Sequence, residues 1–408
     1  MIKFEFSKYM DRFMDHQKLE ETLKKQDDYI NRLQQEELAG WYQEKIEKSS
    51  LDKIVECSKR LRSQSDYLLV IATGGSYMGS FSFYEMFKEK RDSHHLIYLG
   101  NDLSSKSIRE TLEFLEDKNF CVNVISKSGN TLEIKILYQF VRELLLKKYR
   151  EEEVSKRIVV TTEEKESFLY QEIEKYHYQW FEFPKNIGGR YSLATVAHLL
   201  PLSYVSFDIK KLIDGFYDGK QLLNEAYYYA AIRNQMYLSS KYIENFSVYE
   251  PCAYYYTEFL KQLFAESEGK EKKGILPIST VNTRDLHSLG QYLQDGSNIV
   301  FETVIDIEMK EDVTLSNISI KNLNNSIKES VLKSHYQEDT PSILLQVDYD
   351  LYSFGQLSMF FMLAAVFSSY LLDINPFDQP GVEKYKKELD KIINQKNSSS
   401  FSLSKEDG

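Results

Sequence analysis

The chain has 408 residues and a formal net charge of −11 at pH 7. This length exceeds one ordinary domain, and a hydrophobic share of 42% is enough for buried cores. The acidic balance, with no basic stripe, argues against a nucleic-acid-binding protein. Three widely spaced cysteines, Cys57, Cys121 and Cys252, predict neither a disulfide framework nor a zinc site. No secretory leader or membrane-spanning stretch is recognisable, so we expect a cytoplasmic protein without a membrane partner.

Residues 1–50 are strongly charged and carry apolar residues at helical spacing, which predicts a helical lead-in. Short apolar runs rich in β-branched residues then alternate with helical patterns. The candidate strands lie at 67–72, 95–99, 120–125 and 157–162. The clearest helix between them spans 132–149.

Strand patterns return after residue 200, at 247–256, 275–279, 299–307 and 343–349, and an apolar helix follows at 356–372. This alternation predicts an α/β protein with mainly parallel sheets covered on both faces. We place a first doubly wound domain at 51–190 and a second at 191–395, ending in a C-terminal helix. The polar segment 396–408 predicts a disordered tail.

A glycine-rich loop, Thr73-Gly74-Gly75-Ser76-Tyr77-Met78-Gly79-Ser80, follows the first strand. Glycines let the backbone approach a ligand, and a helix start offers free N–H groups to an anion. The loop matches neither the dinucleotide fingerprint nor the Walker A pattern. Taken alone, it is better explained as a plain strand-to-helix turn.

A second loop, Ser126-Lys127-Ser128-Gly129-Asn130-Thr131, follows the strand at 120–125. One hydroxyl at a helix start is ordinary capping, and Asn130 to Glu133 has the spacing of a capping box. Three clustered hydroxyls exceed what a cap requires. Together they suit a phosphate group, which has three acceptor oxygens.

Four charged or imidazole side chains stand in distinctive strings further along the chain. Arg190 follows Gly188-Gly189, and Glu266 lies between Gln262 and Gly269-Lys270. His287 lies in Thr283-Arg284-Asp285-Leu286-His287, and Lys386 ends the string that begins Phe377-Asp378-Gln379-Pro380-Gly381. Each taken alone is most often a solvated or capping residue. A base, an imidazole and a lysine together are the parts of a proton-transfer enzyme.

These loops and strings, which occur in family order over about residues 60–390, resemble the glucose-6-phosphate isomerase family with its sugar-isomerase (SIS) fold. Thr73 and Lys185 are the departures, standing where the family more often has an aliphatic and an acidic residue. The resemblance implies a substrate-binding set made of Gly75, Ser76, Ser126, Lys127, Ser128, Thr131, Gln262 and Gln379.

The same resemblance implies the catalytic roles. Glu266 would move a proton between neighbouring carbons, and Arg190 would stabilise the enediolate, for which a permanently charged planar donor is suited. His287 and Lys386 would open the sugar ring.

The implied reaction interconverts glucose 6-phosphate and fructose 6-phosphate through a cis-enediol, with no metal or cofactor. The seven histidines show no paired metal-ligand spacing. The resemblance also implies a homodimer, with His287 reaching the neighbouring subunit's site. Two alternatives stay open: a non-catalytic phosphosugar-binding SIS module, and an isomerase that also accepts mannose 6-phosphate.

Overall fold

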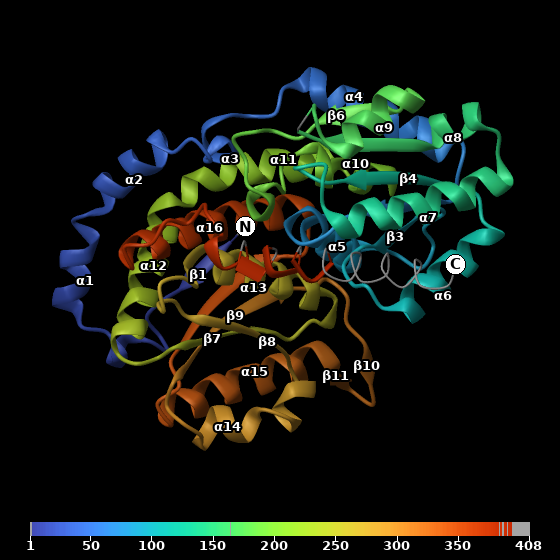
Figure 1. Cartoon of the computed structure of the whole chain (residues 1–408). Helices are drawn as coiled ribbons and strands as arrows, with labels where there is room; N and C mark the ends of the chain where they lie inside the picture. Colours follow the sequence, from blue (N-terminus) through green and yellow to red (C-terminus); the bar gives the residue numbers. More distant parts are fainter. Residues whose placement is uncertain (1, 164, 383, 386, 390, 394–408) are drawn as a thin grey trace, which may run out of the picture.

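The computed structural model describes residues 2–163, 165–382, 384–385, 387–389 and 391–393. Two five-stranded sheets form its centre, and helices lie on both faces of each sheet (Figure 1). The predicted architecture is confirmed: an α/β protein with mainly parallel, doubly wound sheets.

The first sheet is wholly parallel, with strand order β3-β2-β4-β5-β6. Alternate side chains of its central strands enter different cores, because successive residues of a strand point to opposite faces. Leu68 and Val70 pack into one core, and Leu69 and Ile71 into the other. The strands are β2 (Tyr67–Ile71), β3 (His95–Leu99), β4 (Phe120–Ile125), β5 (Ile158–Thr162) and β6 (Gln179–Glu182).

Helices cover this sheet on both sides. The core that contains Leu68 also contains residues of α4 (Lys48–Arg62), α5 (Gly75–Phe87) and α10 (Val196–Tyr204). The core that contains Leu69 holds residues of α6 (Ser105–Glu116), α7 (Leu132–Lys148), α8 (Glu151–Arg157) and α9 (Phe168–Tyr176).

The second sheet has the order β1-β12-β9-β7-β8, and only the pairing of β1 with β12 is antiparallel. In Figure 1, α14 and α15 lie below this sheet, α13 and α16 lie above it, and α12 lies at its left. Its strands are β1 (Lys3–Glu5), β7 (Ile243–Val248), β8 (Leu276–Val281), β9 (Val300–Glu308) and β12 (Ser342–Asp348). The helices of this half are α11 (Ile209–Asp218), α12 (Leu223–Leu238), α13 (Tyr254–Glu268), α14 (Gly290–Asp295), α15 (Ile320–Gln337) and α16 (Leu351–Leu371).

Shorter elements complete the described chain. A hairpin is formed by β10 (Thr314–Leu315) and β11 (Ile318–Ser319). The lead-in contains α1 (His16–Leu23), α2 (Gln26–Gln35) and α3 (Gly40–Gln43), but it also contributes β1, which the helical pattern does not predict. The 3-10 turns are η1 (Asp11–Phe13), η2 (Gly189–Tyr191), η3 (Gly219–Leu222), η4 (Pro251–Ala253) and η5 (Arg284–His287).

The predicted apolar helix at 356–372 is α16, which begins five residues earlier. By length and composition it could cross a membrane, yet 83% of its most apolar window is buried inside the protein. Such a helix, apolar all round, is also what the centre of a large core requires.

One predicted strand is wrong over most of its length. The strand expected at 247–256 ends at Val248, and residues 254–256 begin α13. Pro251 opens the turn η4 between them. Proline cannot donate to a sheet ladder and suits the first turn of a helix, so the chain changes there from strand to helix.

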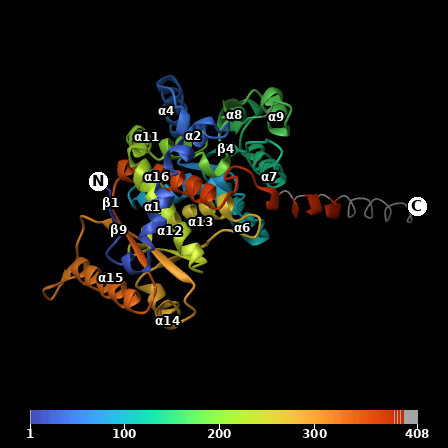
Figure 2. The same ribbon diagram turned by 90° about the vertical axis from the view of Figure 1, so that its left-hand side faces the viewer.

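Beyond residue 379, the described residues are helical at 380–382, 384–385, 387–389 and 391–393. Figure 2 shows this C-terminal part extending away from the body of the molecule. Tyr385 and Ile392 are exposed accordingly. The predicted tail, 396–408, lies outside the described residues.

Candidate active site

The glycine-rich loop joins β2 to α5, as predicted. Gly74 has φ +55°, which favours glycine. A Cβ atom on Gly75 would lie 2.3 Å from the carbonyl carbon of Gly189 and 2.4 Å from the amide nitrogen of Arg190. Gly75 therefore lets the loop touch the segment that carries Arg190, and Ser76 is buried directly beside it.

The hydroxyl loop leaves β4 and enters α7. Ser126 Oγ and Thr131 Oγ1 lie 2.9 Å apart, and the Gly129 amide donates to Ser126 Oγ at 3.1 Å. The expected capping role of Asn130 is wrong: Thr131 is the N-cap residue and makes no side-chain cap bond, while Asn130 Oδ1 accepts from the Phe168 amide. The first amides of α7 thus lack a side-chain cap, which suits an anion at this helix start.

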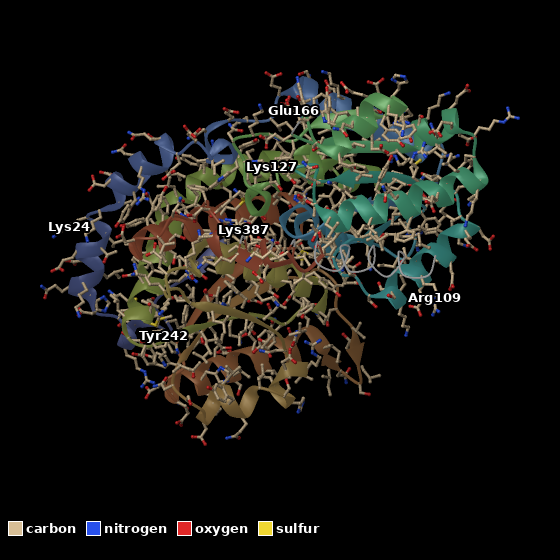
Figure 3. All side chains as sticks on the ribbon, viewed as in Figure 1. Lys24, Arg109, Lys127, Glu166, Tyr242 and Lys387 are labelled. Atoms are coloured by element: carbon tan, nitrogen blue, oxygen red, sulfur yellow. The ribbon has the colours of Figure 1, made fainter. Side chains whose placement is uncertain are left out.

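Both loops meet the segment 185–190. Lys127 Nζ donates to the carbonyl oxygens of Lys185 at 2.8 Å and Ile187 at 2.9 Å, and lies 3.4 Å from Glu163 Oε2. In Figure 3, Lys127 is labelled directly above Lys387, which lies near the middle of the view. Because β2 and β4 are parallel neighbours, their carboxyl ends bring the two loops to the same edge of the sheet.

Arg190 is 3% exposed and lies in η2. Its Nε donates to Ser267 Oγ at 2.9 Å, and its Nη2 donates to the carbonyl oxygen of Pro376. Its Nη1 lies 3.5 Å from Glu266 Oε2. A buried guanidinium fixed in this way is a preorganised donor for a developing oxyanion.

Glu266 lies on the last turn of α13 and keeps part of its carboxylate accessible, with the side chain 29% exposed. Its Oε1 accepts from Gln262 Nε2 at 2.9 Å, and its Oε2 accepts from Gln379 Nε2 at 2.9 Å. The three predicted residues Gln262, Glu266 and Gln379 therefore form one hydrogen-bonded group beside Arg190.

Two predicted catalytic residues are not part of this group. His287 is exposed in η5 after β8, and among the described residues no hydrogen bond or ion pair links it to Glu266 or Arg190. Lys386 lies outside the described residues.

Two residues that support the site were not predicted from the sequence. Trp41 of the lead-in stacks on Tyr191, with ring centroids 5.3 Å apart and planes within 7°. His198 accepts from the Ser80 amide at 2.9 Å, and burial lowers its pKa to about 4, so it is neutral. Neither residue stands in a recognisable string, and only its position in the fold reveals its role.

Within the part of the chain that the structure describes, no group of three or more His, Cys, Asp or Glu side chains is arranged to hold a metal ion. A cavity of about 850 Å3 does not coincide with the Glu266 group. It is lined by residues such as Ile54, Cys57, Trp180 and Ile187 and by none of the predicted site residues. The hydrogen-bonded carboxylate, not the cavity, marks the candidate site.

A family model described as phosphoglucose isomerase matches residues 58–300. The chain is 36% identical to the glucose-6-phosphate isomerase of Streptococcus pneumoniae strain G54, over 95% of both chains. The chain belongs to the phosphoglucose isomerase family.

Two solved structures share the fold of this family member. The hypothetical protein TT0462 of Thermus thermophilus aligns with a TM-score of 0.85 at 21% identity, over 97% of this chain and 99% of the other. A glucose-6-phosphate isomerase of Chlamydia trachomatis aligns with a TM-score of 0.76 at 20% identity, over 86% of this chain and 74% of the other.

Proposed function

We propose that the protein is a glucose-6-phosphate isomerase, which interconverts glucose 6-phosphate and fructose 6-phosphate through a cis-enediol. The observation that carries the proposal is the placement of Glu266. Two amide donors hold its carboxylate, and a buried guanidinium lies 3.5 Å away. A proton-transfer base beside a fixed cation is what enediolate chemistry requires.

The two loops at the sheet edge would anchor the substrate. The phosphate binds at the start of α7, where Ser126, Ser128 and Thr131 supply hydroxyls and Lys127 a nearby positive charge. Glu266 then takes a proton from the carbon next to the carbonyl and returns it to the neighbouring carbon. Arg190 stabilises the negative charge that develops on oxygen in between.

The test is Glu266→Gln, assayed in both directions with a coupled enzyme. Glutamine keeps the shape but removes the basic oxygen, so kcat should fall on the order of 10²-fold or more. Glu258→Gln is the matched control, because Glu258 lies two turns earlier on α13 and pairs with Lys261. Near-normal kcat in Glu266→Gln would remove this residue from the mechanism.

Two other functions are separated by the same assay. A non-catalytic phosphosugar-binding module would bind the sugar phosphates without turnover, although the accessible, amide-bound carboxylate favours catalysis. An isomerase of broader specificity would also convert mannose 6-phosphate. Running the assay with each sugar phosphate distinguishes this broader enzyme from one that accepts only glucose 6-phosphate and fructose 6-phosphate.

We also propose a cytoplasmic homodimer in which His287 completes the neighbouring subunit's site. His287 is exposed and unconnected to Glu266 among the described residues. Leu289 and Tyr292, which follow it, are large hydrophobic side chains that are 38% and 42% exposed. Exposed apolar residues of this kind are enriched where subunits meet.

A further inference from the structure

The segment 375–379 has no regular secondary structure, yet it presents Gln379 to the Glu266 carboxylate. Backbone groups outside helices and sheets need other partners when they are buried. Arg190 supplies some of these partners, because it donates to the carbonyl oxygens of Pro376 and Asp378. The Phe377 ring packs 5.6 Å from the ring of Tyr191.

Lys270 supplies further partners. It lies just after α13, four residues beyond Glu266. Its Nζ donates to Asp378 Oδ1 at 2.6 Å and to the carbonyl oxygen of Asn375. The Lys270 side chain is only 8% exposed, whereas that of Asp378 is 53% exposed. Lys270 thus binds both Asn375 and Asp378, the first and last residues of the stretch just before Gln379, and we call these two contacts the clamp.

The clamp is shielded from water on the lysine side. Burial lowers the pKa of Lys270, and the hydrogen bond to Asp378 opposes this effect. A partly desolvated ammonium makes stronger hydrogen bonds than an exposed one, so it can fix an irregular segment.

We propose that Lys270 is a positioning residue of the isomerase reaction, acting through Asp378 and the 375–379 segment to hold Gln379 against Glu266. This proposal rests on the proposed role of Glu266 as the base. Each carboxylate oxygen has two acceptor sites, and the two glutamine amides occupy one on each. The two amides therefore determine how the remaining acceptor sites of the Glu266 carboxylate face the substrate.

The position of the amides matters because proton transfer is sensitive to small displacements. A shift of about 1 Å in a reacting group can cost on the order of 10²-fold in rate. Without Lys270, the segment would keep its bonds to Arg190 and the packing of Phe377 on Tyr191, but the carboxylate of Asp378 would lose its ion pair with the lysine. The part of the segment just before Gln379 would then be held by fewer contacts, so the Gln379 amide would be positioned less closely.

The experiment compares Lys270→Met with Lys273→Met in the coupled isomerase assay. Lys273 donates to the carbonyl oxygen of Leu372 at 3.0 Å, so its loss removes a cation from the same region without touching the 375–379 segment. We expect kcat to fall about tenfold or more in Lys270→Met and to change little in the control. KM should rise less than kcat falls, because the phosphate anchor is elsewhere.

The deciding step repeats Lys270→Met in a Gln379→Ala background. If Lys270 acts through Gln379, the additional loss of kcat there should be less than about twofold. An equal loss in both backgrounds, or no loss in either, would overturn the proposal. If Lys270→Met does not fold, Asp378→Asn tests the same clamp at an exposed side chain.

Glu266→Gln in the same assay separates two failures. If Glu266→Gln is inactive and Lys270→Met is fully active, Glu266 remains the proposed base and the positioning role of Lys270 is contradicted. If Glu266→Gln is active, the role of Glu266 as the base is itself contradicted.

Discussion

The hydroxyls of the 126–131 loop form hydrogen bonds within the loop that a phosphate would replace. Ser126 and Thr131 lie 2.9 Å apart, and Ser128 Oγ accepts from the Asn130 amide at 3.3 Å. Both bonds are local and neutral. A dianionic phosphate would attract the same donors more strongly, because hydrogen bonds to a charged group are about twice as strong.

Replacing Ser126, Ser128 and Thr131 together by alanine should therefore weaken substrate binding. KM for sugar phosphates should rise about tenfold or more, since each hydrogen bond to a charged group contributes roughly 1.5–3 kcal/mol. Inorganic phosphate should lose potency as a competitive inhibitor. Ser104→Ala is the control, because Ser104 caps α6, the helix that follows β3. Unchanged phosphate inhibition in the triple variant would place the anion elsewhere.

Residue roles were predictable only where a local string carried them. Glu266 stands in such a string, and the structure places Gln262, Gln379 and Arg190 around it. The two residues that follow it face in other directions, because successive helix residues lie about 100° apart. Ser267 bonds Arg190, and Glu268 is fully buried against Arg233 at 2.8 Å. No sequence pattern links residues so far apart in the chain, so these contacts could not be predicted from the sequence.

At the scale of elements, α15 docks on the second sheet through a buried ion pair. His335 Nδ1 lies 2.6 Å from Glu302 Oε2, with both side chains almost wholly buried. Burial by itself lowers the pKa of His335, but the hydrogen bond and charge of Glu302 outweigh it, so the pKa is raised above the ordinary 6.5.

This pair predicts a pH-dependent stability. Because the folded-state pKa is raised, the contribution is fully present below pH 6.5 and is lost as pH rises through the folded value. In urea unfolding between about pH 6 and 9, His335→Gln should lose this fall in the free energy of unfolding. His16→Gln, at an exposed imidazole, is the control. An identical slope in His335→Gln and the wild-type protein would contradict the assignment.

The strands with continuous apolar runs were the most predictable elements. Those expected at 95–99 and 120–125 match β3 and β4 residue for residue. The short edge strand β6 was not predicted, because four residues, none of them fully buried, give little periodicity. The strand β1 lies in a charged lead-in, and only its pairing with β12 defines it.

At the scale of the whole molecule, the separation of His287 from Glu266 can be tested by mixing subunits. Glu266→Gln and His287→Ala should each be inactive alone. If the site is shared, a mixed dimer has one site with both residues intact. Random assortment makes about half of the dimers mixed, so roughly a quarter of wild-type activity should return after co-refolding.

The comparison needs a measure of dimer composition. Distinguishable tags on the two variants would report the fraction of mixed dimers directly. Mixed dimers without recovered activity would mean that each site is built within one chain.

The pairing of β1 with β12 has a consequence for how the chain acquires its structure. Lys3–Glu5 is synthesised long before its partner strand, which begins at Ser342, so the register Lys3↔Gln346 joins residues that are far apart in the sequence. Until β12 has been synthesised, the sheet edge with which β1 pairs does not exist. A contact between residues so far apart in sequence is also slow to form. The second sheet can therefore close only after β12 has been synthesised, whereas the first sheet, whose strands all lie between residues 67 and 182, can assemble earlier during translation.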